Sequence, residues 1–145
     1  MTRGHPSKDV ARAISRFFAV RGLVRRTLAR GKRLDPSAWL HIETLKFIAD
    51  RDRPRQKDLA TYLSITAPSA TSLVANLVKQ GLVVRKSDER DKRALRLALS
   101  PKGERTLKAA LRRGARLLEQ LFAALSEREL TAFTRSLERL LEAGK

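Results

Sequence analysis

A charged segment in the second half of the chain carries the side chains best suited to binding chemistry. The run Asp88-Glu89-Arg90-Asp91-Lys92-Arg93 places both signs of charge side by side. Arginine and lysine are the usual ligands of phosphate groups, and neighbouring carboxylates can hold them in place. The segment lies between two apolar runs. We therefore expect the tip of a projecting ribbon that meets a polyanion.

The apolar runs on either side of this tip predict two short strands. Residues 82–84 open the first strand, and Leu95, Leu97 and Leu99 alternate with Arg96 and Ala98 in the second. A plain hairpin would favour a two-residue turn that contains glycine. This connection is longer and carries arginine and aspartate instead, which favours a hairpin whose tip binds a polyanion.

Composition favours a polyanionic partner. The 145 residues make one domain's worth of chain, and 32 Lys and Arg against 15 Asp and Glu leave a net charge of +17. Nucleic acid is the first candidate, ahead of an anionic membrane surface and of a merely basic protein surface. With no Cys and two distant His, we expect no transition-metal site and no cofactor.

Other classes of protein lack their signatures in this sequence. No apolar run approaches the roughly 18 residues of a membrane span, and residues 1–9 do not resemble a signal peptide. We therefore expect a cytoplasmic protein with no membrane partner. The sequence shows neither a nucleophile–base motif nor a glycine-rich phosphate loop. We expect no catalytic residues and no enzyme activity.

Caps and apolar periodicity predict six helices. Ser7, Asp35, Thr66, Ser100 and Ser126 are suited to cap helices, and Ser126 forms a capping box with Glu129. Gly31, Gly81 and Gly144 mark helix ends. The expected helices cover residues 8–31, 36–49, 56–63, 67–80, 101–125 and 127–144.

The order of these elements predicts the architecture. A short helix, a tight turn, a helix rich in small residues and a charged hairpin form a winged helix–turn–helix. The expected fold is mainly α with a small β-hairpin wing (α+β), with the winged region at 35–100. Residues 1–34 and 101–145 are expected to form long helices, each with a stripe of apolar residues, mostly leucine. A domain this small cannot bury all of these stripes by itself, so their burial needs a partner. We expect these segments to be dimerisation helices.

The same residues resemble the MarR family of transcription regulators. Residues 58–83 resemble the family's helix–turn–helix, and residues 99–104 its link into the fifth helix. Asp88, Arg90, Asp91 and Arg93 match its Asp-x-Arg-Asp-x-Arg wing signature. The resemblance covers essentially the whole chain. It implies a homodimeric, sequence-specific regulator of transcription, a repressor rather than an activator, that binds a pseudo-palindromic operator in double-stranded DNA. A non-specific architectural nucleic-acid binder is the alternative.

The resemblance also assigns roles to residues. The recognition helix contributes Ala67, Pro68, Ser69, Thr71 and Ser72 toward the bases and Asn76 and Lys79 toward phosphates. The wing contributes Arg85, Lys86, Asp88, Arg90, Asp91, Lys92 and Arg93, with Arg90 in the minor groove. The preceding helix contributes Arg55, Gln56 and Lys57 toward the DNA backbone. We expect Asp88 and Asp91 to position Arg90 and Arg93 by ion pairing.

This chain departs from the family pattern at three positions. Ser72 stands where many members carry an arginine, so we expect weaker direct readout of bases. Arg55 replaces a Ser or Thr cap, which predicts a less firm start of the short helix. Pro54 limits pairing in the winged domain's third strand.

A small-molecule effector is a further expectation from the resemblance, because family members often bind one between the dimer helices and the winged domain. The residues that could line such a pocket are Phe17, Trp39, His41 and Phe47. Ordinary packing of these side chains is the alternative.

Overall fold

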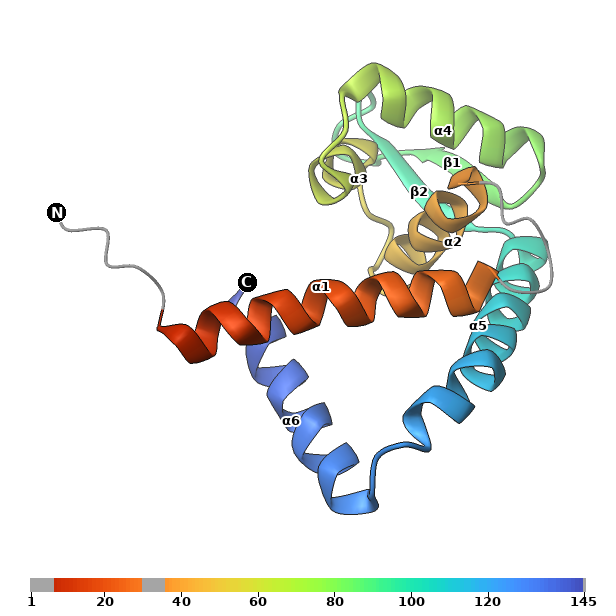
Figure 1. Ribbon diagram of the computed structural model, residues 1–145. Coiled ribbons are helices and arrows are strands. Elements are labelled where there is room, and N and C mark those ends of the chain that lie inside the picture. Colours follow the sequence, from red (N-terminus) through yellow and green to blue (C-terminus); the bar gives the residue numbers. More distant parts are fainter. Residues whose placement is uncertain (1–6, 30–35, 145) are drawn as a thin grey trace, which may run out of the picture. The chain divides into compact units, whose positions relative to one another are not determined.

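The computed structural model describes residues 7–29 and 36–144, and it has the expected fold class (Figure 1). Helices α1 and α2 precede the helix–turn–helix formed by α3 and α4. A two-stranded antiparallel hairpin and the helices α5 and α6 follow. The bounds of the elements are α1 Lys8–Ala29, α2 Pro36–Ala49, α3 Gln56–Leu63, α4 Ala67–Lys79, β1 Val83–Ser87, β2 Leu95–Leu99, α5 Pro101–Phe122 and α6 Glu127–Ala143.

The chain divides into two compact units. The winged unit comprises residues 34–113, and the terminal-helix unit comprises residues 1–33 and 114–145. The sequence suggested a boundary at residue 100, but the first half of α5 belongs to the winged unit. Gly103 and Leu107 of α5 are buried, and this packing explains the later boundary.

Four of the predicted helix caps are present. The hydroxyls of Ser7, Thr66, Ser100 and Ser126 each accept a backbone N–H from three residues further on, at 2.9 to 3.4 Å. Each bond satisfies one of the N–H groups that a helix start leaves without a partner. The predicted Asp35 cap and Gly31 stop lie outside the described residues.

Three helices end earlier than predicted, α6 by a single residue, at Ala143. Helix α4 ends at Lys79, because Gln80 is its C-cap and Gly81 adopts a left-handed φ of 72°. Helix α5 ends at Phe122 rather than 125, where Leu125 N–H bonds back to the Phe122 carbonyl in a turn. The turn brings the chain to the Ser126 cap of α6.

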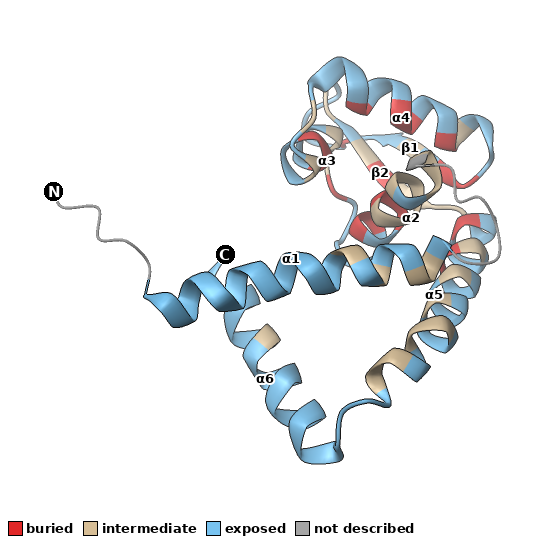
Figure 2. Cartoon of the chain, in the orientation of Figure 1, coloured by how far each residue is buried: buried red, intermediate tan, exposed pale blue. Residues whose placement is uncertain are grey.

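The hydrophobic core lies in the winged unit. Leu45, Leu59, Leu77 and Leu97 come from α2, α3, α4 and β2, and each is fully buried. The hairpin pairs Val83 with Leu99 through Ser87 with Leu95, so that Leu97 points inward. By contrast, α1 and α6 contain no buried residue in the described part of the chain (Figure 2).

Helix α5 joins this core at Gly103. The bare Cα of Gly103 lies against the Leu82 backbone, and a Cβ there would overlap the Leu82 carbonyl oxygen. The same carbonyl is held by a hydrogen bond, because it accepts Ser100 N–H at 3.0 Å. The residue before β1 therefore cannot move away easily.

We predict that Gly103→Ala destabilises the protein by about 3 kcal/mol or more, because the new methyl group would meet backbone rather than a movable side chain. Urea denaturation measures the effect. Gly114→Ala in the same helix is the control, since its Cβ would lie at an ordinary 3.6 Å from Leu28 Cδ2. Alanine's helix propensity should make that change neutral or stabilising by up to about 1 kcal/mol. Equal effects of the two substitutions would contradict the steric argument.

Candidate nucleic-acid interface

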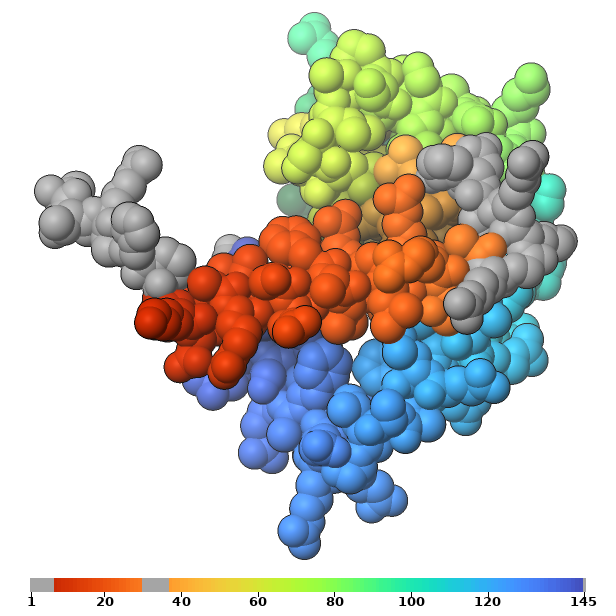
Figure 3. Space-filling model, in the orientation of Figure 1, coloured from red at the N-terminus to blue at the C-terminus, as the bar shows by residue number. Residues whose placement is uncertain are grey.

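The turn between α3 and α4 presents the start of α4 to solvent. Ser64 adopts a left-handed φ of 54°, and Ile65 N–H closes the turn on the Ala60 carbonyl. Helix α4 then buries one face, formed by Ala70, Leu73, Val74 and Leu77. The predicted base-facing residues Ala67, Pro68, Ser69, Thr71 and Ser72 are all exposed. Figure 3 shows the yellow-green α4 at the molecular surface.

The hydroxyls at this end of α4 are not equally free. Thr71 Oγ1 donates to the Ala67 carbonyl at 2.9 Å and accepts from Gln56 Nε2 at 2.9 Å. Ser69 Oγ shares a 2.8 Å hydrogen bond with Thr66 Oγ1. Among the described residues, Ser72 makes no side-chain hydrogen bond. The structure therefore leaves the Ser72 hydroxyl as the freest donor for base edges, with the Thr71 methyl available to thymine.

Both aspartates of the wing signature hold the backbone of the tip. Asp88 Oδ1 accepts Arg90 N–H at 2.9 Å, and Asp91 Oδ1 accepts Arg93 N–H at 3.1 Å. Asp88 N–H donates to the Ala94 carbonyl at 3.0 Å and closes the loop. In each Asp-x-Arg unit the aspartate thus fixes the main chain of the arginine two residues on.

The predicted ion pairs within the tip are wrong. Asp88 is only 7% exposed and pairs with Arg96 Nε at 2.8 Å and with Arg55 Nη2 at 3.4 Å. Among the described residues, neither aspartate pairs with Arg90 or Arg93. The physical reason is reach, because a short aspartate side chain bonds more readily to the N–H two residues on than to a side chain that points away.

These contacts lower the pKa of Asp88 to about 2. The Arg90 N–H makes the largest contribution, followed by the hydrogen bond and charge of Arg96. Arg96 also donates to the Arg53 carbonyl at 3.0 Å and so ties the base of the wing to the segment before α3. The contacts of Arg96 with Asp88 and Arg53 were not predicted from the sequence. The signal that could have indicated them is a charged residue within the apolar alternation of the second strand.

The start of α3 is firmer than its Arg55 cap position suggested. Asp58 accepts Arg55 N–H at 3.0 Å, which supplies the capping bond from inside the helix. The guanidinium of Arg55 is half-buried and directed to Asp88. The third strand is reduced to an isolated bridge between Arg55 and Arg96, next to a bond from Leu97 N–H to the Pro54 carbonyl. This agrees with the limit expected from Pro54.

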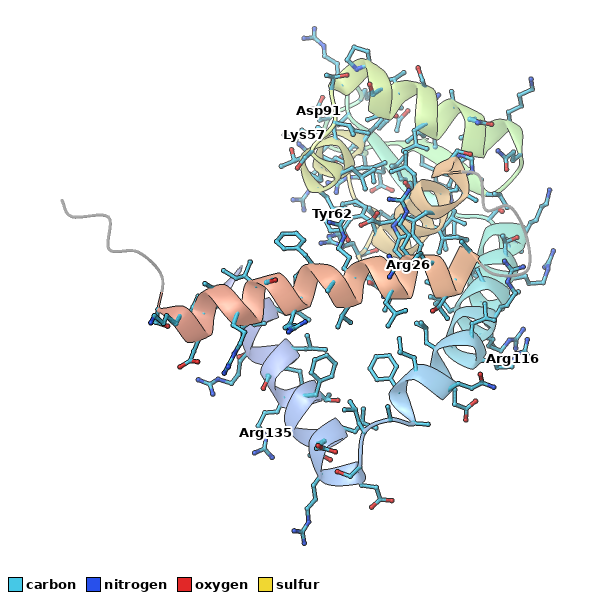
Figure 4. All side chains as sticks on the ribbon, viewed as in Figure 1. Arg26, Lys57, Tyr62, Asp91, Arg116 and Arg135 are labelled. Atoms are coloured by element: carbon cyan, nitrogen blue, oxygen red, sulfur yellow. The ribbon has the colours of Figure 1, made fainter. Side chains whose placement is uncertain are left out.

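The predicted wing cations differ in whether their side chains are bonded within the protein or are exposed. Arg85 Nη2 donates to the Thr71 carbonyl at 3.3 Å, so this residue ties β1 to α4. Lys86, Arg90, Lys92 and Arg93 are exposed, and within the described chain none of them is in an ion pair. A shallow depression lies between the start of α3 and the wing, and its lining includes Lys57, Asp91 and Arg93. Figure 4 labels Lys57 and Asp91, which lie near each other. Gln56 and Arg85 hold the recognition helix, and the exposed cations face solvent.

The predicted effector residues do not form one site in the winged unit. Phe47 is 3% exposed and stacks on Tyr62 with ring centroids 4.7 Å apart, so it belongs to the core. Arg51 covers the Phe47 ring at 4.0 Å. Trp39 is exposed and His41 half-buried on α2, and Phe17 lies in the other unit.

Residues 7–29 and 36–144 contain no cluster of three or more His, Cys, Asp or Glu arranged to hold a metal ion. No helix in this part of the chain is both long and apolar enough to cross a membrane.

Comparison with known proteins agrees with this geometry. A family model described as MarR family matches residues 34–94. YsmB of Bacillus subtilis, an uncharacterized HTH-type transcriptional regulator, is 28% identical over 83 residues, 57% of each chain. A MarR family protein from Bacillus stearothermophilus has a TM-score of 0.79 at 21% identity, covering 98% of this chain and all of the other. Streptococcus pneumoniae FabT, solved in complex with DNA, has a TM-score of 0.67 at 21% identity, covering 95% and 99%.

The capped turn, the exposed start of α4 and the charged hairpin define a winged helix–turn–helix protein. Residues 34–94 match the MarR family model, and the resemblance inferred from the wing signature is confirmed. Proteins of this family are regulators of transcription rather than enzymes.

We predict that Asp88→Asn weakens DNA binding about tenfold or more, because the new amide would place an N–H group against either Arg96 or the Arg90 N–H, whichever way it is turned. In the unsubstituted protein the pKa of Asp88 is depressed below its ordinary 3.8. Its stabilising contribution is therefore complete above about pH 4 and lost as the pH falls toward 2. Fluorescence anisotropy and acid-unfolding curves measure the two effects.

Asp91→Asn is the matched control for this substitution. Its amide oxygen can still accept Arg93 N–H, and Asp91 has no ion pair in the described structure to lose. We expect it to leave DNA binding and acid stability nearly unchanged. Equal losses in the two variants would show that the backbone bonds common to both aspartates, rather than the ion pairs of Asp88, matter.

Proposed function

We propose that the chain is a homodimeric, sequence-specific transcription regulator that represses by occupying a pseudo-palindromic operator. One observation carries the proposal. Both aspartates of the wing signature accept hydrogen bonds from the backbone of the wing tip. The Arg90 and Arg93 side chains are left exposed and without ion pairs in the described chain. Free guanidinium groups on a fixed loop suit a narrow minor groove or phosphates.

The link between the wing and the recognition helix supports binding at both grooves. Thr71 at the exposed start of α4 is bonded to Gln56 of α3 and to Arg85 of β1. The reading helix is therefore fixed relative to the hairpin. A helix in the major groove with a hairpin beside it is the usual docking of this motif. FabT, which shares the fold, has been solved with DNA.

We predict that Arg90→Ala weakens binding to a selected operator by about 10- to 100-fold, as expected when one specific arginine contact is lost. The measurement compares a duplex selected from a random pool with a duplex of random sequence at one salt concentration. The matched control is Arg128→Ala on α6, which is also an exposed arginine but lies outside the winged unit. Unchanged affinity of the Arg90 variant would remove the wing from the interface.

A specific observation favours the architectural alternative as a second candidate. Helix α4 carries no arginine, and the chain has a net charge of +17. Phosphate attraction alone supports non-specific binding. In the same measurement, a ratio of operator to random affinity near one would favour an architectural binder over a regulator.

Apolar residues exposed on both terminal helices support the proposed homodimer. Phe17 and Phe18 of α1 are 56% and 58% exposed, and Leu140 and Leu141 of α6 are 66% and 70% exposed. Large apolar patches on a monomer surface indicate a partner. A second copy would bury them and, by two-fold symmetry, present two reading helices to one operator.

We predict that light scattering gives twice the 16.3 kDa chain mass, and that Leu140→Glu with Leu141→Glu shifts the protein to monomer because carboxylates cannot be buried unpaired. Arg139→Glu, on the opposite face of α6, is the control and should remain dimeric. A monomeric unsubstituted protein at micromolar concentration would refute the homodimer and leave DNA binding by the winged unit to be judged separately.

Release of the operator by a small-molecule effector is the remaining part of the proposal. It is supported by the resemblance rather than by a defined pocket. Of the four residues named for it, Trp39 and His41 keep accessible surface in the winged unit, whereas Phe47 does not.

A further inference from the structure

The first half of α5 carries a concentration of positive charge that the recognition helix and wing do not account for. Residues 101–113 contain five cations and one carboxylate, Glu104. The other residues of the winged unit contain twelve cations and eight carboxylates. Each set has an excess of four positive charges, so half of this unit's excess lies on a short piece of α5. We name the five cations the α5 basic stripe: Lys102, Arg105, Lys108, Arg112 and Arg113.

The stripe occupies one side of the helix. Gly103 and Leu107 form the buried side, whereas all five cations are exposed. At 3.6 residues per turn, Arg105, Lys108 and Arg112 point within a sector of about 60°. With a rise of 1.5 Å per residue, the stripe is about 16 Å long, which matches roughly five base pairs of duplex.

This arrangement opposes the stability of the helix itself. Lys102 lies in the first turn, where the helix dipole disfavours a cation. Lys108 and Arg112 are four residues apart, a spacing at which like charges repel. Elsewhere in the winged unit, Lys46, Arg55 and Arg96 are paired with carboxylates, but no stripe cation is in an ion pair within the described chain. A row of phosphates would relieve this repulsion.

The stripe begins beside the recognition helix. Lys102 Nζ donates to the carbonyl of Gln80, the C-cap of α4, at 2.8 Å. That is the end of α4 opposite to the base-facing residues 67–72. The stripe is therefore next to the DNA-reading surface but separate from it.

We propose that the α5 basic stripe binds the sugar-phosphate backbone of DNA, independently of sequence, as a second contact outside the helix–turn–helix and wing. The inference rests on the proposed DNA-binding function and extends its surface. Its contribution is electrostatic, so it should appear chiefly in the salt dependence of binding.

The test compares two double variants of the full chain that each lose two arginines. Arg105→Gln/Arg112→Gln removes charge from the stripe, and Arg128→Gln/Arg135→Gln removes the same charge from exposed positions on α6. Binding to a 40-base-pair random duplex is measured over a salt series. We expect the slope of log affinity against log salt to fall by about 1.8 for the stripe variant, with no change for the α6 variant.

A second set of measurements decides between explanations. Combined with Arg90→Ala, the stripe variant should show additive losses, because the two surfaces are separate. Circular dichroism and thermal melting check that both variants fold, and Lys108→Gln/Arg113→Gln replaces the first variant if it does not.

Equal slopes of log affinity against log salt for the stripe and α6 variants would overturn the inference while leaving the proposed function standing. Loss of binding to polyglutamate with unchanged DNA binding would overturn it in favour of an acidic protein partner. No DNA binding by the unsubstituted chain would refute the proposed function and the inference together.

Discussion

The buried carboxylate of Asp88 organises the proposed DNA-binding surface of this protein. It accepts a backbone N–H from the wing tip, a guanidinium from β2 and a second guanidinium from the residue before α3. Buried charge is tolerated only where it is paired and hydrogen-bonded, and these partners meet that requirement. One side chain thus couples the conformation of the tip to the start of the helix–turn–helix.

Thr71 is a second residue at which the wing and the helix–turn–helix are joined by hydrogen bonds. Gln56 bonds the Thr71 hydroxyl, and Arg85 bonds its carbonyl, so α3, α4 and β1 meet at one residue. These bonds fix the recognition helix, but they also occupy the Thr71 hydroxyl. A hydroxyl bonded within the protein has less capacity to form a hydrogen bond with a base. With few free donors on α4, the proposed DNA recognition must depend more on phosphate charge and on the shape of the groove.

The elements of the fold were predictable because their signals are local. Thr66 and Ser126 cap their helices through bonds to the residue three positions on, and leucine alternation placed β2 correctly. The partners of Asp88 were not predictable, because Arg55 lies 33 residues away and only the folded chain brings it near. The sequence suggested Phe47 as a pocket residue, but Phe47 is part of the core. The periodicity of a helix shows which residues share a face, but it does not show whether that face lines a pocket or packs in the core. The fixed approach of Gly103 to Leu82 likewise depends on how α5 meets the hairpin.

The small size of the wing has a consequence for solubility. A two-stranded hairpin has two edges, and an unprotected edge can pair with the same edge of another molecule. On the β2 side, the isolated bridge to Arg55 occupies part of the edge, and Pro54 has no N–H to extend it into a ladder. On the β1 side, Arg85 and Lys86 place like charges along the strand. Both edges therefore resist intermolecular strand pairing, and residues of the proposed DNA interface also protect the hairpin from aggregation.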